Sequence, residues 1–187
     1  MGLLLLGATV NAQSSAPKTE LRKTSAHRSN ELTLAGLRPG RDTASRAVQL
    51  YRKPTGADAG RDAPLVWTAA CRTRSLSIDV DATGAIQVIR TAETSKPPQD
   101  CRQGFPLAWK TGRGLRIGDR ATRVTALYGA PDSKSPSTRD GQQLELMYYA
   151  FDWAGQDVPQ VMEVVCTAEK DGVPGQVVEI TLAAPSL

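Results

Sequence analysis

The sequence predicts an α+β protein made of two tandem repeats, each a short helix packed on an antiparallel sheet of about three to four strands. Two observations predict this fold. Residues 42–54 and 119–131 match at six of thirteen positions, which indicates an internal repeat. Each copy is followed by short runs that are apolar or alternate between apolar and polar, as in strands that bury one face. A chain of 187 residues with 40% apolar residues has room for two such units.

Composition divides the chain into five segments. The polar stretch over 13–30 shows no apolar period, and a Pro/Gly-rich stretch separates the two copies. The segments that we expect are a signal peptide at 1–12, a flexible N-terminus at 13–30, repeat 1 at 31–94, a linker at 95–113 and repeat 2 at 114–187.

Each repeat copy is interpreted as one short helix. Asp42 and Asp119 stand where a side-chain oxygen can accept a hydrogen bond from the first turn, so both are predicted N-caps. In the second copy Val124, Leu127 and Tyr128 are spaced i, i+3 and i+4, which places them on one apolar face. We therefore expect this stretch to have a structural role, with its apolar face packed against a sheet.

The two predicted helices differ at their C-terminal ends. Gly129 suits the left-handed position after a helix, and Pro131 prevents the helix from continuing. The first copy keeps Leu50 and Tyr51 but has Arg52 where the second has glycine. We therefore expect a less sharply defined end for the first helix.

Strands are expected after each helix. In residues 75–81 the apolar Leu76, Ile78 and Val80 alternate with polar residues, which predicts one buried face. The expected strands lie at 65–70, 75–81 and 85–91 in the first half and at 143–153, 161–169 and 176–183 in the second.

A short apolar run opens the sequence and predicts export. Leu3 to Leu6 are followed by small residues, and Val10 and Ala12 fit the small-x-small rule for signal cleavage before Gln13. In the alternative interpretation, this run is an apolar N-terminus of a cytosolic protein. This run is too short to span a membrane, and no later segment is long and apolar enough. We expect a periplasmic or extracellular protein without a transmembrane segment.

Three cysteines allow one disulfide and one leftover thiol. Cys71 and Cys101 both stand near turn or linker residues, so in an oxidising compartment we expect them to pair. Cys166 lies in an apolar run and is interpreted as a small buried hydrophobe. Because the chain has no CxxC and its single histidine, His27, lies in a polar stretch, no metal is expected.

The stretch around the second helix also carries a family motif. Gly118, Val124, Gly129 and Pro131 resemble the G-x5-V-x4-G-x-P signature of the SmpA/OmlA and β-lactamase-inhibitor-protein-like families. The resemblance implies small secreted or envelope α+β modules, which the inhibitor proteins carry in two tandem copies. The first copy departs from the motif at Arg52, and the lipid-anchor cysteine of SmpA/OmlA is missing.

Catalytic and ligand-binding patterns are weak. Residues 79–84 begin like a calcium loop, but the position that needs a bidentate carboxylate holds Arg90, so a hairpin turn is favoured. A nucleophilic triad needs a positioned histidine, and His27 is badly placed for that role. We expect no cofactor, and an enzyme is the weakest of the functional hypotheses.

The run 143–153 is the best candidate for a contact surface. Met147, Tyr149, Phe151 and Trp153 share one face of the predicted strand with Glu145, and a charge among large aromatics is typical of protein interfaces. In the alternative interpretation, both faces are buried, one under the helix and one under the other half of the molecule.

Charge is unevenly distributed along the chain. Residues 1–139 hold 22 Lys/Arg and 11 Asp/Glu, whereas residues 140–187 hold one Lys and eight acids. A nucleic-acid-binding surface needs aromatic residues among its basic residues. Here the aromatic residues are most concentrated in the acidic part of the chain, which argues against nucleic-acid binding. The sequence therefore predicts a secreted or periplasmic, non-enzymatic protein-binding or scaffold module with a protein partner. The alternative is a proteinaceous inhibitor of a hydrolase.

Overall fold

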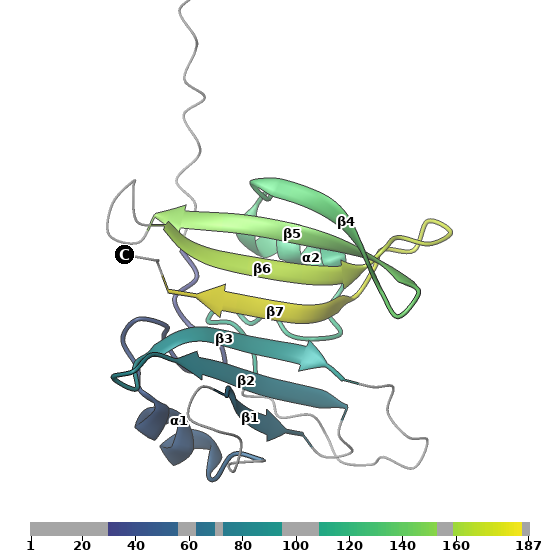
Figure 1. Cartoon of the computed structure of the whole chain (residues 1–187). Helices are drawn as coiled ribbons and strands as arrows, with labels where there is room; N and C mark the ends of the chain where they lie inside the picture. Colours follow the sequence, from purple (N-terminus) through teal and green to yellow (C-terminus); the bar gives the residue numbers. More distant parts are fainter. Residues whose placement is uncertain (1–29, 56–62, 70–72, 95–108, 153–158, 185–187) are drawn as a thin grey trace, which may run out of the picture.

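The computed structural model describes residues 30–55, 63–69, 73–94, 109–152 and 159–184. Its elements in these ranges are α1 (Ala44–Tyr51), β1 (Leu65–Thr68), β2 (Arg74–Val80), β3 (Ile86–Glu93), α2 (Ala121–Tyr128), β4 (Ser133–Arg139), β5 (Gln142–Asp152), β6 (Pro159–Thr167) and β7 (Val177–Ala183). One helix and three strands are thus followed by one helix and four strands (Figure 1).

All seven strands of the described ranges form one antiparallel sheet, in the order β1-β2-β3-β7-β6-β5-β4. β3 pairs with β7 from Val88↔Ala183 to Ala92↔Glu179, which joins the two halves edge to edge. The predicted fold of two tandem repeats, each with its own sheet, is therefore wrong. A separate half would leave the edge of its last strand unpaired, and the β3–β7 pairing removes both edges.

Both helices pack on the same face of this sheet, which we call the helix face. The ring of Tyr51 in α1 lies 6.0 Å from the ring of Trp67 in β1, and the ring of Tyr128 in α2 lies 5.8 Å from that of Tyr149 in β5. Buried residues of the connecting segments belong to the same hydrophobic core, namely Leu34, Leu37, Trp109, Leu115 and Ile117. No described helix covers the opposite face, which we call the open face (Figure 1).

The expected alternation is confirmed in β2, whereas β4 was not predicted. Leu76 and Ile78 are fully buried and Asp79 is exposed. In β4 every residue is exposed, so this edge strand lacks the apolar period that identifies a half-buried strand. Pro136 lies in the middle of β4, where an edge strand tolerates the missing N–H.

The two helices are attached to the sheet by equivalent backbone hydrogen bonds. In each half, a glycine before the helix bonds to the first residue of β3 or β7, and the first helical residue bonds to the loop before that strand. The bonds are Gly40 N–H to Ile86 O (2.7 Å), Ala44 N–H to Gly84 O (3.0 Å), Gly118 N–H to Val177 O (2.8 Å) and Ala121 N–H to Gly175 O (2.7 Å). Each helix is therefore held at its first turn by the loop that precedes a central strand.

The predicted N-caps are wrong. Thr43 and Arg120 hold the N-cap positions, and neither side chain caps its helix. The carboxylates of Asp42 and Asp119 instead accept hydrogen bonds from backbone N–H groups four and three residues upstream, at 2.7 and 3.1 Å. These hydrogen bonds close the turn before each helix. A carboxylate that makes such a local bond to the backbone is not available to cap the helix.

The expectation of a less sharply defined end for α1 is also wrong. Arg52 ends α1 with φ 67° and ψ −160°, and Gly129 ends α2 with φ 78° and ψ −164°. In both, the backbone N–H bonds to the carbonyl four residues upstream. Arg52 therefore adopts a conformation that normally requires glycine.

Candidate functional site

The aromatic residues that were predicted to form a contact surface belong to the core. Met147, Tyr149 and Phe151 are each at most 2% exposed and lie on the helix face of β5. The rings of Tyr149 and Phe151 stack at 6.0 Å, and Tyr128 of α2 packs against both. Trp153, the fourth predicted contact residue, lies outside the described residues. These three side chains are too deeply buried to form a contact surface for a partner.

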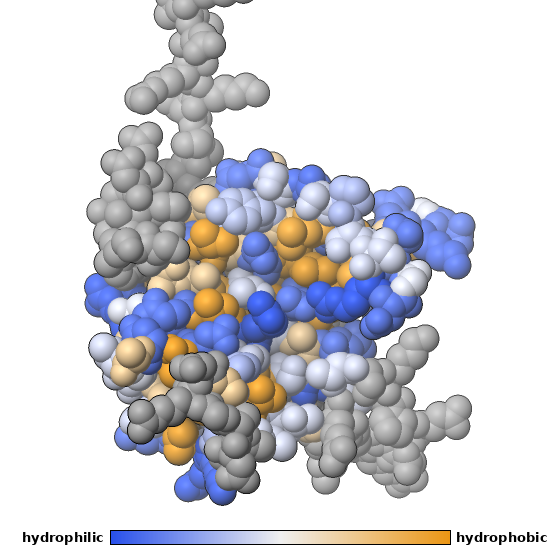
Figure 2. Space-filling view, viewed as in Figure 1, coloured by the Kyte–Doolittle hydropathy of each residue, from blue (hydrophilic) through white to orange (hydrophobic). Residues whose placement is uncertain are grey.

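The open face is the broad surface that remains, and the strand register defines three rows of side chains across it. The apolar row, as we call it, consists of Val88, Ala183, Val161 and Ala150, from β3 to β5. The second row consists of Ser77, Arg90, Thr181, Glu163 and Tyr148, and the third of Ala92, Glu179, Val165 and Leu146. All four members of the apolar row are partly exposed. Figure 2 views this face and shows apolar patches on either side of a hydrophilic band.

The charged groups of the open face form an ion network. Arg90 Nε lies 3.4 Å from one carboxylate oxygen of Glu179, and the guanidinium of Arg139 lies 2.9 Å from the other. Arg90 Nε also lies 3.3 Å from the hydroxyl of Thr181. Arg139 comes from the end of β4, at the hairpin that leads into β5, so this hairpin reaches over the face toward β7. The network links the first half to the second and orders the middle of the open face.

A pocket of about 450 Å³ lies between the start of α2, the β4–β5 hairpin and the segment before β7. Thr122 and Thr125 line it from the helix, and Lys134 and Glu145 line it from the strands. The last two pair with each other at 3.0 Å, so Glu169 is the charged lining residue that lies outside this pair. The open face is the stronger candidate because it combines apolar groups with an ordered charged network over several strands.

The cysteine predictions fall partly outside the described residues. Cys71 and Cys101 both lie outside the described residues, so their disulfide stays a prediction. Cys166 is a buried free thiol of β6, as expected for a small hydrophobe. Burial, together with the nearby carboxylate of Glu145, raises the pKa of this thiol to about 12, so it is protonated at neutral pH.

The residues of the predicted calcium-like loop form the turn between β2 and β3. One carboxylate oxygen of Asp81 accepts hydrogen bonds from the N–H and hydroxyl of Thr83 and from the N–H of Ala85. Its other oxygen accepts one from the side chain of Gln87 at 2.8 Å. These bonds, first of all the one from the Thr83 hydroxyl, lower the pKa of Asp81. This carboxylate serves the turn, as the hairpin interpretation expected.

The motif residues of the second half take structural positions. Val124 and Tyr128 are buried beneath α2, and Leu127 is partly buried beside them. Gly118 and Gly129 both have positive φ, at 89° and 78°, where a side chain would be strained. Tyr51 lies at the corresponding place of α1 and donates its hydroxyl to the carbonyl of Ala35, and Pro131 follows α2.

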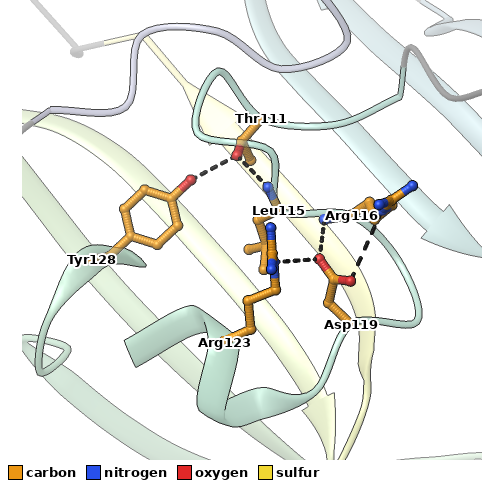
Figure 3. Close-up of polar contacts among 6 residues, drawn as sticks. All are labelled: Thr111, Leu115, Arg116, Asp119, Arg123 and Tyr128. Atoms are coloured by element: carbon orange, nitrogen blue, oxygen red, sulfur yellow. Dashed lines mark hydrogen bonds and ion pairs between the residues drawn. The ribbon is translucent and has the colours of Figure 1, made fainter. Parts of the chain in front are cut away.

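A buried carboxylate that sequence reasoning missed joins the N-terminal segment to the second half. Glu31 is 2% exposed and accepts five hydrogen bonds of 2.7–3.1 Å. The donors are the backbone N–H groups of Leu32, Thr33, Gly112 and Arg113 and the hydroxyl of Tyr128. Thr111 extends the network, because its hydroxyl lies 2.7 Å from that of Tyr128 and accepts from the N–H of Leu115 (Figure 3). Nothing in the sequence marks this residue, because three of its five donors lie 81 to 97 positions away.

Comparison with known proteins adds little to this picture. No protein-family model and no curated protein matches the chain. Among solved structures it is similar to YjgB, a DUF4309 family protein from Bacillus subtilis, at 13% identity and a TM-score of 0.44, over 82% of this chain and 87% of that one. A likeness at this TM-score does not establish a shared fold. The resemblance to the SmpA/OmlA and inhibitor-protein families stays a prediction.

Proposed function

We propose that this chain is an exported, non-enzymatic protein-binding module whose partner docks on the open face of the sheet. The observation that carries the proposal is the apolar row, in which Val88, Ala183, Val161 and Ala150 lie side by side and partly exposed. The Arg90–Glu179–Arg139 network lies beside this row. An apolar centre next to polar and charged groups is the composition of a protein interface.

The dimensions of the open face also favour a protein partner. Seven strands about 4.8 Å apart make a sheet roughly 30 Å wide, and a strand of seven residues is about 23 Å long. The resulting area is comparable to the roughly 800 Å² that each partner contributes to a standard interface. The ion network holds its side chains in place before binding, which lowers the entropic cost of ordering them.

The non-enzymatic part of the proposal rests on the available nucleophiles and bases. His27, the single histidine of the sequence, lies in its polar N-terminal stretch. The thiol of Cys166 is buried and protonated, which is the opposite of an activated nucleophile. No helix in the described ranges is long and apolar enough to cross a membrane.

Export rests on residues 1–12, which lie outside the described residues. Sequencing the N-terminus of the protein recovered from the periplasm or the medium is the direct measurement. We expect it to begin at Gln13. A mature form that retains Met1 contradicts this part of the proposal.

Position-specific photo-crosslinking tests the docking face. Tyr148 is partly exposed on the open face, and it can be replaced by a photo-reactive phenylalanine analogue of similar shape. The control places the same group at Val48, which is 41% exposed on α1. We expect one protein to crosslink from position 148 and not from position 48. Equal labelling from both positions, or none from position 148, overturns the assignment of the open face.

Binding measurements with the identified partner then test the apolar row. Val161→Glu introduces a charge at the centre of the row, and Val48→Glu is the matched control on α1. We expect Val161→Glu to weaken binding at least about tenfold, because an unpaired charge must be buried, while Val48→Glu leaves it unchanged. A partner hydrolase that loses activity when bound would assign the inhibitor role, and any other partner the scaffold role.

A further inference from the structure

Basic side chains gather on the helix face, away from the proposed docking surface. Residues 110–123 hold five basic residues and one acid, in a chain whose net charge is +4. Arg74 of β2 lies beside them, since its guanidinium is 3.2 Å from the position that a Cβ at Gly118 would occupy. We call this group the basic surface; it consists of Arg74, Lys110, Arg113, Arg116, Arg120 and Arg123. All except the partly buried Arg74 are exposed.

Several of these guanidinium groups are held in place. Arg116 and Arg123 both reach the carboxylate of Asp119, at 4.0 and 3.2 Å (Figure 3). Arg113 lies over the ring of Tyr128, 5.6 Å from its centre, and donates to the carbonyl of Leu127. Because these contacts restrict the side chains, binding a ligand costs them less conformational entropy than it costs side chains without contacts.

The clustering of like charge needs a reason, because it opposes folding. Burial lowers the pKa of Arg74, and the positive charge of Arg116 lowers it further, against the opposing effects of Glu93 and Asp119. Asp119 is the acid within residues 110–123, and Glu93 and the buried Glu31 offset part of the positive charge from outside this segment. The remaining excess of positive charge repels itself, and such repulsion is reduced when a ligand brings negative charge. The surface is therefore electrostatically complementary to an anionic ligand.

The chemistry of the surface favours carboxylates on a polypeptide. Asp119 shows the fit, because one carboxylate is held between two arginines and also accepts the backbone N–H of Arg116. Each guanidinium has five N–H donors, so one carboxylate leaves donors for others. An acidic segment that runs along the surface would meet several of these groups in turn.

Two other polyanions fit less well. Stable binding to a bilayer usually adds several inserted apolar side chains to the basic ones. Of the exposed large apolar residues in the described ranges, Leu32 lies near this surface, next to the Glu31 carboxylate that accepts the N–H of Arg113, and a single such side chain is a weak membrane anchor. Single-stranded nucleic acid needs exposed rings for stacking, whereas Tyr128 is 3% exposed and lies under Arg113.

We propose that the basic surface binds an acidic polypeptide segment, at a site separate from the open face. The binding is independent of the partner proposed above, so either proposal can fail without the other. The guanidinium groups pair with side-chain carboxylates of the ligand, and the strength of the interaction falls with ionic strength.

Binding of fluorescently labelled poly-glutamate to the full chain tests this proposal. The test variant is Arg116→Gln/Arg120→Gln, and the matched control is Arg46→Gln/Lys53→Gln near α1, which removes the same charge. In about 0.1 M salt we expect the test variant to weaken binding at least about tenfold and the control less than about threefold. Thermal melts of all proteins confirm that each is folded, and Arg116→Lys/Arg120→Lys should retain most of the binding because it keeps the charge.

Each remaining outcome of this titration overturns the proposal. Equal weakening by test and control variants would mean that only net charge is sensed. Vesicles of anionic phospholipid that bind more tightly than poly-glutamate, and lose binding in the test variant, would assign the surface to a membrane. Duplex or single-stranded DNA that binds more tightly than poly-glutamate, and loses binding in the test variant, would assign the surface to nucleic acid. Absence of poly-glutamate binding at low salt would show that this surface is not a site for acidic chains.

Discussion

At the scale of single residues, Arg52 shows how a side chain can occupy a position built for glycine. Its φ of 67° and ψ of −160° match those of Gly129 at the end of the other helix. The carbonyl of Arg52 accepts a hydrogen bond from the indole of Trp67 at 3.1 Å, which helps to hold this conformation. Residues other than glycine pay about 1–3 kcal/mol in this region of φ and ψ.

Replacing Arg52 by glycine should therefore stabilise the protein. Part of the relieved strain is offset by the greater freedom of glycine in the unfolded chain, so we expect a net gain of about 1 kcal/mol in the free energy of unfolding. Urea titration measures it. Gly129→Ala is the matched opposite change and should cost about 1–2 kcal/mol. If Arg52→Gly destabilises the protein, the strain at α1 is not what the backbone angles indicate.

The hydroxyl of Tyr128 should contribute more to stability than that of Tyr51. Tyr128 donates to the buried carboxylate of Glu31, whereas Tyr51 donates to the neutral carbonyl of Ala35. Hydrogen bonds to a charged group are worth about 1.5–3 kcal/mol and neutral ones about 1 kcal/mol. We expect Tyr128→Phe to lower the free energy of unfolding by about 2 kcal/mol and Tyr51→Phe by about 1 kcal/mol. Equal losses in chemical denaturation would show that Glu31 adds nothing as an acceptor.

The thiol of Cys166 should resist modification in the native protein. Its pKa of about 12 leaves roughly one molecule in 10⁴ as thiolate at pH 8, and its side chain is buried. We expect no alkylation at pH 8 in the native state and rapid alkylation in denaturant, measured by peptide mass mapping. Because the folded state favours the protonated thiol, stability should also fall as the pH rises from about 9 toward 12.

At the scale of elements, the two helices have similar sequences and different degrees of burial. α2 buries Val124 and Tyr128, whereas in α1 Ala47 is the buried residue and Val48 and Leu50 are each 41% exposed. α1 is thus held mainly by its termini and by Tyr51. Leu50 matches Leu127 in the repeat, yet Leu50 is exposed whereas Leu127 is partly buried against the core.

The same substitution in the two helices should have unequal effects. Val124 is fully buried, so Val124→Ala removes two methyl groups from the core and should cost about 2 kcal/mol. Val48→Ala, at a 41% exposed position, should change the free energy of unfolding by less than about 0.5 kcal/mol. Thermal or urea denaturation of the pair measures the difference. A comparable loss at Val48 would mean that α1 is covered by another part of the chain or by a partner.

At the scale of the whole molecule, the β3–β7 pairing makes the two halves dependent on each other. It joins β3 of the first half to β7 of the second over five residue pairs. Glu31 adds a second link, because it binds Gly112, Arg113 and Tyr128. Separating the halves would expose a sheet edge on each side and break these bonds.

Neither half should therefore fold alone. Residues 31–94 and 114–187, expressed separately, are expected to give collapsed or aggregated chains without the dispersed amide spectrum of a folded domain. The whole chain should unfold in one transition that is coincident by tryptophan fluorescence and circular dichroism. A well-dispersed NMR spectrum from either half would show that each repeat is an independent unit after all.

The sequence by itself determined most of the local structure. The internal repeat, the apolar runs and the periods of the apolar residues together placed both helices and all the strands except β4. Burial of one face leaves a period of 2 or 3.6 in the residues themselves. The polar edge strand Ser133–Arg139 was missed because it buries nothing. The alternation of residues 143–153 correctly separated the two faces of this strand, but it did not indicate which face was exposed.

Only the tertiary structure decided how these elements combine. It placed Met147, Tyr149 and Phe151 under α2, which moved the candidate docking surface to the other face of the sheet. It also joined β3 to β7 and brought the carboxylate of Glu31 to residues far along the chain. The physical reason is the same in each case. Local periodicity records how much of a residue is buried, whereas pairing of strand edges and satisfaction of a buried charge depend on groups that the chain brings together only when it folds.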